Sequence, residues 1–199
     1  MIKELQQLSS AEADANGMRE CLESCEYTVE PVLIDPTSKE VKDAVQEMQS
    51  TTQSGDHIVV FYSGHAKRIF EQESGALQLG MKDKWLLFST ITNKLQRAEA
   101  ATVTVFLDCC CAADWTRDSI RGSNPFNARG IAVLCASWGK EAAYEDNIQG
   151  LFTGLLLKAL ASTDNPIVQE NLVTFRSVND YVSNRLQSLM TPLRTDCYQ

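Results

Sequence analysis

The chain has 199 residues, with 18 Lys and Arg against 26 Asp and Glu, which gives a net charge of −8. This length suits one domain, and a composition of 44% hydrophobic and 22% charged residues is that of a folded globule. The acidic balance argues against a nucleic-acid partner, because phosphate backbones bind basic surfaces. No apolar run reaches the roughly 20 residues that span a bilayer, and residues 1–8 lack the apolar core of a signal peptide.

The seven cysteines indicate reduced thiols rather than a disulfide scaffold. Three of them, Cys109 to Cys111, are consecutive, and adjacent cysteines do not easily bridge each other. The chain also has no Asn-X-Ser/Thr site for glycosylation. We therefore expect a reducing compartment, cytosolic or nuclear, with the cytoplasm as the predicted location.

The first elements alternate between helix and strand patterns. Ser9 and Glu12 have the spacing of a helix capping box, and apolar residues follow at helical spacing. Those residues are Met18, Cys21, Leu22 and Cys25. Residues 27–34 are then predicted to form a strand, which Pro31 places at a sheet edge because proline cannot donate to a ladder.

Three apolar runs predict the central sheet. A second helix is expected from Thr37, with Glu40 completing its capping box. The runs 58–62, 103–107 and 131–135 are apolar with little or no alternation, as in strands buried on both faces. Such strands are typical of a mostly parallel sheet with helices on both sides.

The remaining segments complete this α/β pattern. Residues 85–101 are expected to be helical or mixed, and helices are expected over 151–161 and 178–189. Residues 112–130 are polar and carry Gly, Pro and Asn, so they are predicted to form a long loop. Sites in parallel sheets form beyond the carboxyl ends of the strands, which directs attention to the residues that follow each run.

Two reactive residue types follow two neighbouring strands. His65, preceded by Gly64, comes after 58–62, and the cysteine triplet comes after 103–107. Neighbouring parallel strands lie about 4.8 Å apart, so a histidine and a cysteine at their ends can share a substrate. Histidine can take the thiol proton and return it to a leaving amine, while a backbone N–H binds the developing oxyanion.

Simpler interpretations of these residues stay open. A cysteine after a strand is often a small buried hydrophobe, and a single histidine there is often structural or exposed. A zinc site is disfavoured, because three consecutive cysteines cannot all point at one metal and no Cys-X-X-Cys spacing is present. We therefore expect no metal and no cofactor.

The residues around the two strand ends resemble a known family. Residues 56–65, ending in Tyr-Ser-Gly-His, resemble the histidine motif of caspase-like cysteine peptidases, particularly metacaspases, which usually has Tyr-Ser-Gly-His-Gly. Residues 106–113 resemble the Asp-Cys-Cys-His-Ser-Gly cysteine motif. The separation of 45 residues between His65 and Cys110 agrees with the roughly 50 of the caspase signature. Residues 131–153 and 174–186 resemble later blocks of the family.

The resemblance covers nearly the whole chain and implies a fold. It implies a caspase-like three-layer α/β/α sandwich with a mostly parallel central sheet, in a single peptidase domain over 1–199. Residues 1–111 would form the large-subunit-like part, 112–130 the linker and 131–199 the small-subunit-like part. In the family this linker is often cleaved during activation.

The resemblance also assigns roles in catalysis. The family's nucleophile is the second residue after the motif aspartate, which is Cys110 here, and His65 would be the base. Gly64 and Cys110 would supply the oxyanion-hole N–H groups. Cys109 would be buried, and Cys111 stands where a histidine is usual.

A basic-residue pocket is implied as well. In metacaspases the S1 pocket holds a basic P1 side chain, and its residues correspond here to Asp14, Ser63 and Asp108. Carboxylates form strong, often bidentate bonds to a guanidinium, so cleavage after Arg or Lys is predicted. The alternative for Asp14 is an ordinary exposed carboxylate in the first turn of a helix, favoured by the helix dipole. With a basic P1 residue, the linker arginines Arg117, Arg121 and Arg129 become candidate self-cleavage sites.

The sequence departs from the family at several positions. Ala66 replaces a glycine, Cys111-Ala112-Ala113 replaces His-Ser-Gly, and the acidic runs that bind calcium in many metacaspases are not evident after His65. The family's first strand is also expected to be missing before the first helix, so residues 1–8, another chain or direct pairing of the flanking strands would have to fill its place. The alternative to an active endopeptidase is an inactive caspase-like module for binding or regulation. Expected partners are a protein or peptide substrate, with a regulatory protein or a homo-oligomer left open, and no membrane or nucleic acid.

Overall fold

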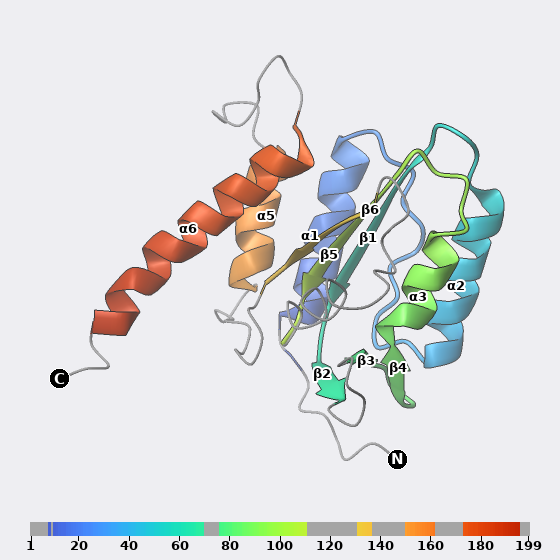
Figure 1. The fold of residues 1–199 in the computed structure, drawn as a ribbon, viewed down its shortest axis with the longest axis horizontal. Coiled ribbons are helices and arrows are strands. Elements are labelled where there is room, and N and C mark those ends of the chain that lie inside the picture. Colours follow the sequence, from blue (N-terminus) through green and yellow to red (C-terminus); the bar gives the residue numbers. More distant parts are fainter. Residues whose placement is uncertain are drawn as a thin grey trace.

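A three-stranded parallel sheet forms the centre of the protein. The computed structural model describes residues 8, 10–69, 76–110, 131–136, 150–161 and 173–195. The strands are β1 (His57–Ser63), β5 (Thr102–Asp108) and β6 (Ile131–Cys135), in the order β1-β5-β6 (Figure 1). Both pairs are parallel. The three strands predicted from apolar runs are therefore confirmed.

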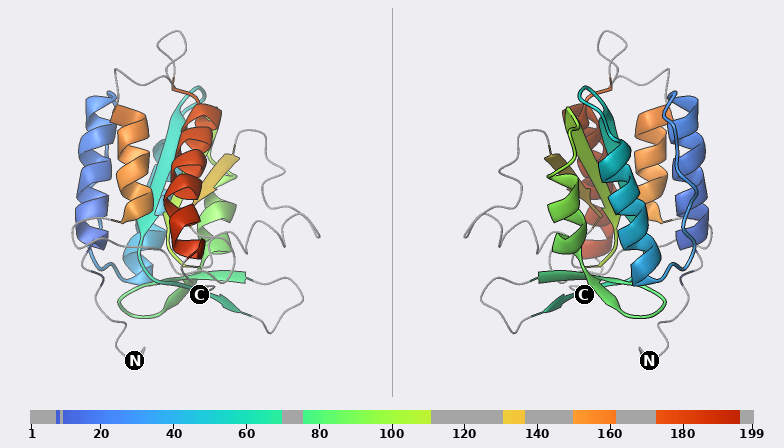
Figure 2. Two further views of the ribbon diagram at one scale, coloured as in Figure 1. Left: turned by 90° about the vertical axis from the view of Figure 1, so that its left-hand side faces the viewer. Right: turned by 90° about the vertical axis from the view of Figure 1, so that its right-hand side faces the viewer.

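Helices cover both faces of this sheet, so the predicted three-layer α/β/α architecture is confirmed. The helices are α1 (Ala11–Ser24), α2 (Ser38–Thr51), α3 (Phe88–Leu95), α5 (Leu151–Ala161) and α6 (Phe175–Thr195). Helices α1, α5 and α6 lie on one face of the sheet, and α2 and α3 lie on the other (Figure 2). The side chains of each group form an apolar cluster with the sheet. None of the described helices is both long and apolar enough to cross a bilayer.

Strand β1 shows why its sequence does not alternate. Ile58 and Val60 pack in the cluster of α2 and α3, whereas Val59 and Phe61 pack in the cluster of α1, α5 and α6. Successive strand residues point to opposite faces, and here both faces are covered by helices. An uninterrupted apolar run is the sequence consequence of that burial.

A second, smaller sheet follows β1 and was missed by the sequence analysis. Strands β2 (Ala66–Ile69), β3 (Ala76–Gly80) and β4 (Trp85–Leu87) are antiparallel, in the order β2-β3-β4. This sheet lies across the end of the molecule where β1 finishes (Figure 2). Strand β4 and helix α3 together account for the stretch that was expected to be helical or mixed.

The two expected capping boxes have different outcomes. At α2, Thr37 Oγ1 accepts the Glu40 N–H at 3.3 Å and the Glu40 carboxylate accepts the Thr37 N–H at 2.7 Å, so this capping box is confirmed. Helix α1 instead has Ser10 as its N-cap, without a side-chain capping bond. The box expected at Ser9 is therefore wrong, because the helix begins one residue later.

Residues 27–34 do not form a strand, so that prediction is wrong. Within the described chain no backbone hydrogen bond joins them to β1, and direct pairing of the two segments is also wrong. Pro31 lacks an N–H donor. A large cavity lies between the segment and β1, so the two do not form a ladder. Residues 1–7 and the linker 112–130 lie outside the described residues.

Candidate active site

The carboxyl ends of β1 and β5 bring His65 and Cys110 to the same edge of the sheet. The register pairs Ser63 with Asp108, and the Gly64 N–H donates to the Asp108 carbonyl at 3.1 Å. His65 and Cys110 each lie two residues beyond the last register pair. Their separation of 45 residues equals the register offset of the two strands, so they occupy equivalent positions beyond the ends of neighbouring strands.

Burial distinguishes the cysteines that the structure describes. Cys109 is 1% exposed and packs in the cluster of α2 and α3, whereas Cys110 is half-buried and free. The alternation follows from β5, whose successive side chains point to opposite faces. Cys110 is therefore the accessible thiol of this pair, and Cys111 lies outside the described residues.

The backbone of His65 is held by two donors from its surroundings. Its carbonyl accepts the Gly80 N–H at 2.7 Å and the Tyr62 hydroxyl at 2.7 Å. Burial raises the pKa of Tyr62 far above its usual value, with the neighbouring Cys109 as a smaller cause, so the hydroxyl remains a neutral donor. The small sheet thereby fixes the chain at His65.

Gly64 is required by the same arrangement. A Cβ at this position would lie 2.7 Å from the Tyr62 hydroxyl oxygen and 2.8 Å from the ring carbon that carries it. From the sequence, Gly64 is expected to allow an open turn before His65 and to offer its N–H group, whereas Tyr62 and Gly80 are not predicted as partners. The signal for Tyr62 was present, because a tyrosine at the end of a buried strand needs a partner for its hydroxyl.

A buried carboxylate from α1 lies beside the end of β1. Asp14 is 1% exposed, and its carboxylate accepts the Ser63 hydroxyl at 2.8 Å and the Gly150 N–H at 2.9 Å. The alternative that Asp14 is an ordinary exposed first-turn carboxylate is therefore wrong. Helix α1 packs against β1, and Asp14 in its first turn points inward.

A second buried carboxylate lies next to the first. Asp108 is 5% exposed and accepts the Thr153 hydroxyl at 2.6 Å and the Thr153 N–H at 3.2 Å. A Cβ on Gly150 would lie 2.5 Å from Asp108 Oδ2 and 3.0 Å from Asp14 Oδ2. Gly150 is thus the point where the two carboxylates meet.

The three residues predicted for substrate binding are brought together by this cluster. Asp14 comes from α1, Ser63 from β1 and Asp108 from β5. Gly150 and Thr153 are not predicted as partners from the sequence, although both lie in the block 131–153 that resembles the family. Among the described residues, no group of three or more His, Cys, Asp or Glu side chains is arranged to hold a metal ion.

The comparisons with known proteins agree with this architecture. The family model described as "Caspase domain" matches residues 2–195. The chain belongs to the caspase domain family. Membership supports a peptidase-like function, suggests a cysteine peptidase hydrolase, and is consistent with protein or peptide substrates.

A solved structure shows the same fold. A protein of Geobacter sulfurreducens, known from its crystal structure, is similar with a TM-score of 0.67 and 18% sequence identity, over 90% of this chain and 80% of that one. No curated protein matches the sequence. At this identity the likeness establishes the caspase-like fold alone.

Proposed function

We propose that the protein is a cysteine endopeptidase that cleaves after Arg or Lys, with Cys110 as nucleophile and His65 as base. The observation that carries this proposal is the equivalent placement of the two residues, each two positions past the register at the ends of neighbouring parallel strands. The free, half-buried thiol at Cys110 supports the assignment of the nucleophile over the buried Cys109.

The reaction would proceed in two steps. His65 takes the Cys110 proton, the thiolate attacks the scissile carbonyl carbon, and His65 then gives its proton to the departing amine, leaving a thioester. Water, deprotonated by His65, hydrolyses the thioester and regenerates the thiol. The N–H of Cys110 would stabilise the oxyanion in both steps. The N–H of Gly64, the second donor expected from the sequence, already donates to the Asp108 carbonyl and is not available for this role.

The choice of a basic P1 residue rests on the carboxylates at Gly150. Asp14 and Asp108 are both buried, and both lie beside this glycine. Two buried carboxylates in one place disfavour a further negative charge from a substrate and favour a cation between or beside them. An Arg or Lys side chain of a substrate would supply that cation, and an Asp side chain would be repelled.

The test measures hydrolysis of short fluorogenic peptides that end in Arg, Lys or Asp. We expect turnover of the Arg and Lys peptides only, a loss of all turnover in Cys110→Ala, and a fall of about 10²–10⁴-fold in kcat for His65→Ala. No Cys110-dependent turnover of any peptide by a folded sample would support the alternative, an inactive caspase-like module. Preferred cleavage after Asp would overturn the specificity while leaving the nucleophile in place.

A matched pair of carboxamide variants tests the pocket. Asp14→Asn keeps the size of the side chain but removes its charge, and we expect kcat/KM for the Arg peptide to fall about 100-fold, the order seen when one partner of a buried charge pair is lost. Glu12→Gln, two residues earlier on the same helix and exposed, is the control and should have no effect. Equal losses in both variants would exclude Asp14 from the pocket.

A further inference from the structure

The turn between β3 and β4 is tied to the start of α2. Asp83 lies in this turn, and its carboxylate accepts the Ser38 N–H at 2.6 Å and the Ser38 hydroxyl at 2.8 Å. One residue earlier, the Lys82 N–H donates to the Pro36 carbonyl at 2.9 Å. The turn therefore lies against the N-terminal end of α2 (Figure 1).

Burial of Ser38 makes this link more than a surface contact. Ser38 is 2% exposed and is the first residue of α2, where a backbone N–H has no acceptor within the helix. A buried donor without an acceptor destabilises a fold, and the Asp83 carboxylate satisfies both donors of Ser38. The bond from the Ser38 N–H lowers the pKa of Asp83 from its usual value, so this carboxylate is ionised at neutral pH.

The other end of the turn leads to the backbone of His65. Gly80, three residues before Asp83, ends β3, and its N–H donates to the His65 carbonyl at 2.7 Å. The Tyr62 hydroxyl lies 2.7 Å from that carbonyl oxygen and 3.1 Å from the carbonyl oxygen of Gly80. The position of Gly80 therefore sets where the His65 carbonyl lies.

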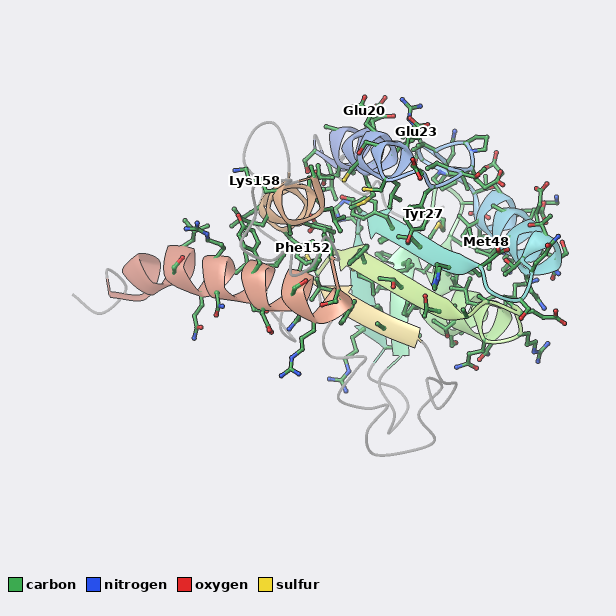
Figure 3. All side chains as sticks on the ribbon, turned by 90° about the horizontal axis from the view of Figure 1, so that it is seen from above. Glu20, Glu23, Tyr27, Met48, Phe152 and Lys158 are labelled. Atoms are coloured by element: carbon green, nitrogen blue, oxygen red, sulfur yellow. The ribbon has the colours of Figure 1, made fainter. Side chains whose placement is uncertain are left out.

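The chain between Gly80 and Asp83 is held tightly. Met81 is 4% exposed and packs in the cluster of α2 and α3, and its N–H donates to the Lys84 carbonyl at 3.1 Å, which closes the turn. Helix α2 is itself fixed to the sheet, since Met48 packs against the same cluster (Figure 3). Closely packed segments transmit a displacement rather than absorb it, so a shift of the turn at Asp83 should reach Gly80.

His65 depends on the small sheet because the main ladder ends before it. The last register pair of β1 is Ser63 with Asp108, and His65 lies two residues beyond it. The next residue, Ala66, already belongs to β2 and pairs with Leu79 of β3. A base must lie within hydrogen-bond reach of the proton that it takes, so the path of the chain at His65 bears directly on the reaction.

We propose that Asp83 is a positioning residue for His65: by fixing the β3–β4 turn to α2, it sets the place of Gly80 and hence of the His65 backbone beside Cys110. This role rests on the proposed function, in which His65 takes the Cys110 proton. Asp83 acts through other residues, so its loss should slow the proton transfers and lower kcat. Binding of the substrate, and with it KM, should stay nearly unchanged.

The test compares two exposed carboxylates at the same end of α2. Asp83 accepts the N–H and the hydroxyl of Ser38, and Glu40 accepts the N–H and the hydroxyl of Thr37, but only Asp83 lies in the turn that leads to Gly80. With an Arg-ending fluorogenic peptide, we expect kcat to fall about tenfold in Asp83→Ala and KM to stay within about twofold, with no such fall in Glu40→Ala. Asp83→Asn keeps an acceptor for the Ser38 N–H and should retain most of kcat.

Hydrogen exchange at the Gly80 amide, followed by NMR, tests the same link without turnover. Because the Gly80 N–H is bonded to the His65 carbonyl, we expect its exchange to be about tenfold faster in Asp83→Ala and unchanged in Glu40→Ala. If the wild type shows no Cys110-dependent turnover, the proposed function fails, and the exchange rate alone decides whether Asp83 holds this part of the chain. Unchanged exchange in Asp83→Ala, or unchanged kcat in an active enzyme, would overturn the proposal. Equal falls in kcat for the two alanine variants would overturn it too, because the effect would then come from the stability of α2.

Ser38→Ala is a milder variant that decides the question if Asp83→Ala does not fold. It removes only the hydroxyl that donates to Asp83 and leaves the N–H bond in place, so kcat should fall about threefold with KM unchanged. Lys82→Ala is the control in the same turn, because the Lys82 side chain is exposed and its bond to Pro36 comes from the backbone. An unchanged kcat in Ser38→Ala, or an equal fall in Lys82→Ala, would contradict the role of Asp83.

Discussion

Strands β1 and β5 have similar sequences in different structural positions. Both contain a five-residue, largely apolar run ending at a sheet edge that carries the candidate site, and they pair residue by residue from His57 with Thr102 to Ser63 with Asp108. Among the described residues, strand β5 has a neighbour on each side, whereas β1 has one. An apolar run therefore reports that a strand is covered by helices on its two faces, but it does not report how many strands flank it.

Proline substitutions at one register pair should give the largest difference in the free energy of unfolding between the two strands. Val59 and Thr104 lie opposite each other, and both are half-buried. The Thr104 N–H faces β1 inside the sheet, so Thr104→Pro should lower the free energy of unfolding by about 3 kcal/mol or more. The Val59 N–H faces away from β5, so Val59→Pro loses no ladder bond to a described strand and should cost less than Thr104→Pro, mainly through the lost packing of the Val59 side chain. Urea denaturation of both variants measures the difference, and equal losses would mean that β1 is paired on both sides.

A substitution just after the end of β1 should have a smaller effect on stability. Gly64→Ala places a Cβ against the Tyr62 hydroxyl, with no room for it unless β1 or the small sheet shifts. We expect a loss of about 1–3 kcal/mol, as for other overpacked sites. Gly55→Ala, where the added Cβ meets nothing within 4 Å, is the control for the glycine change itself, although its φ of 100° adds strain of its own. The decisive readout is kcat, which should fall only in Gly64→Ala because that residue adjoins His65.

Removing the Tyr62 hydroxyl should have a still smaller effect, and one that depends on pH. Tyr62→Phe deletes a donor to the His65 carbonyl, which keeps the Gly80 N–H, so the cost should be about 0.5–1.5 kcal/mol at neutral pH. Burial raises the pKa of Tyr62 above its ordinary value of 10.0, so only the unfolded chain releases this proton as the pH passes 10. The stability of the wild type should therefore fall above pH 10, and the variant should lack this contribution. Parallel curves for the two proteins from pH 8 to 11 would contradict the burial of the hydroxyl.

Much of this architecture was predictable, and the failures have physical causes. Strand positions and helices followed from the local pattern of apolar residues, and Thr37 with Glu40 formed the expected capping box. Residues 27–34 failed as a strand because pairing depends on a partner in space, which local sequence does not specify. Strands β2 and β3 are short, and the polar Lys67, Arg68 and Gln78 leave little apolar alternation to detect.

The candidate site was predictable to a similar extent. Positions of His65 and Cys110 followed from strand ends and their spacing, and the sheet register places them at equivalent points. Partners that come from distant segments were missed, because Gly80 reaches His65 through β3 and Gly150 reaches Asp14 across 136 positions of the chain. Such contacts are set by tertiary packing rather than by neighbours in sequence.

The smallest expected effect concerns the turn that begins the unpaired segment. At the end of α1 the Tyr27 N–H donates to the Leu22 carbonyl and the Glu26 N–H to the Glu23 carbonyl, the pattern of a Schellman motif with Glu26 in the left-handed conformation. Glycine adopts this conformation without a Cβ penalty, so Glu26→Gly should raise the free energy of unfolding by about 0.5–1 kcal/mol. Thermal and urea unfolding measure the gain, and Glu23→Gly, within the helix, should instead lose about 1 kcal/mol. Because residues 27–34 are held at their ends rather than by a ladder, a gain at Glu26 would show that the turn, and not pairing to β1, sets the path of this segment. A lower free energy of unfolding in Glu26→Gly would mean that this turn does not set the path of the segment.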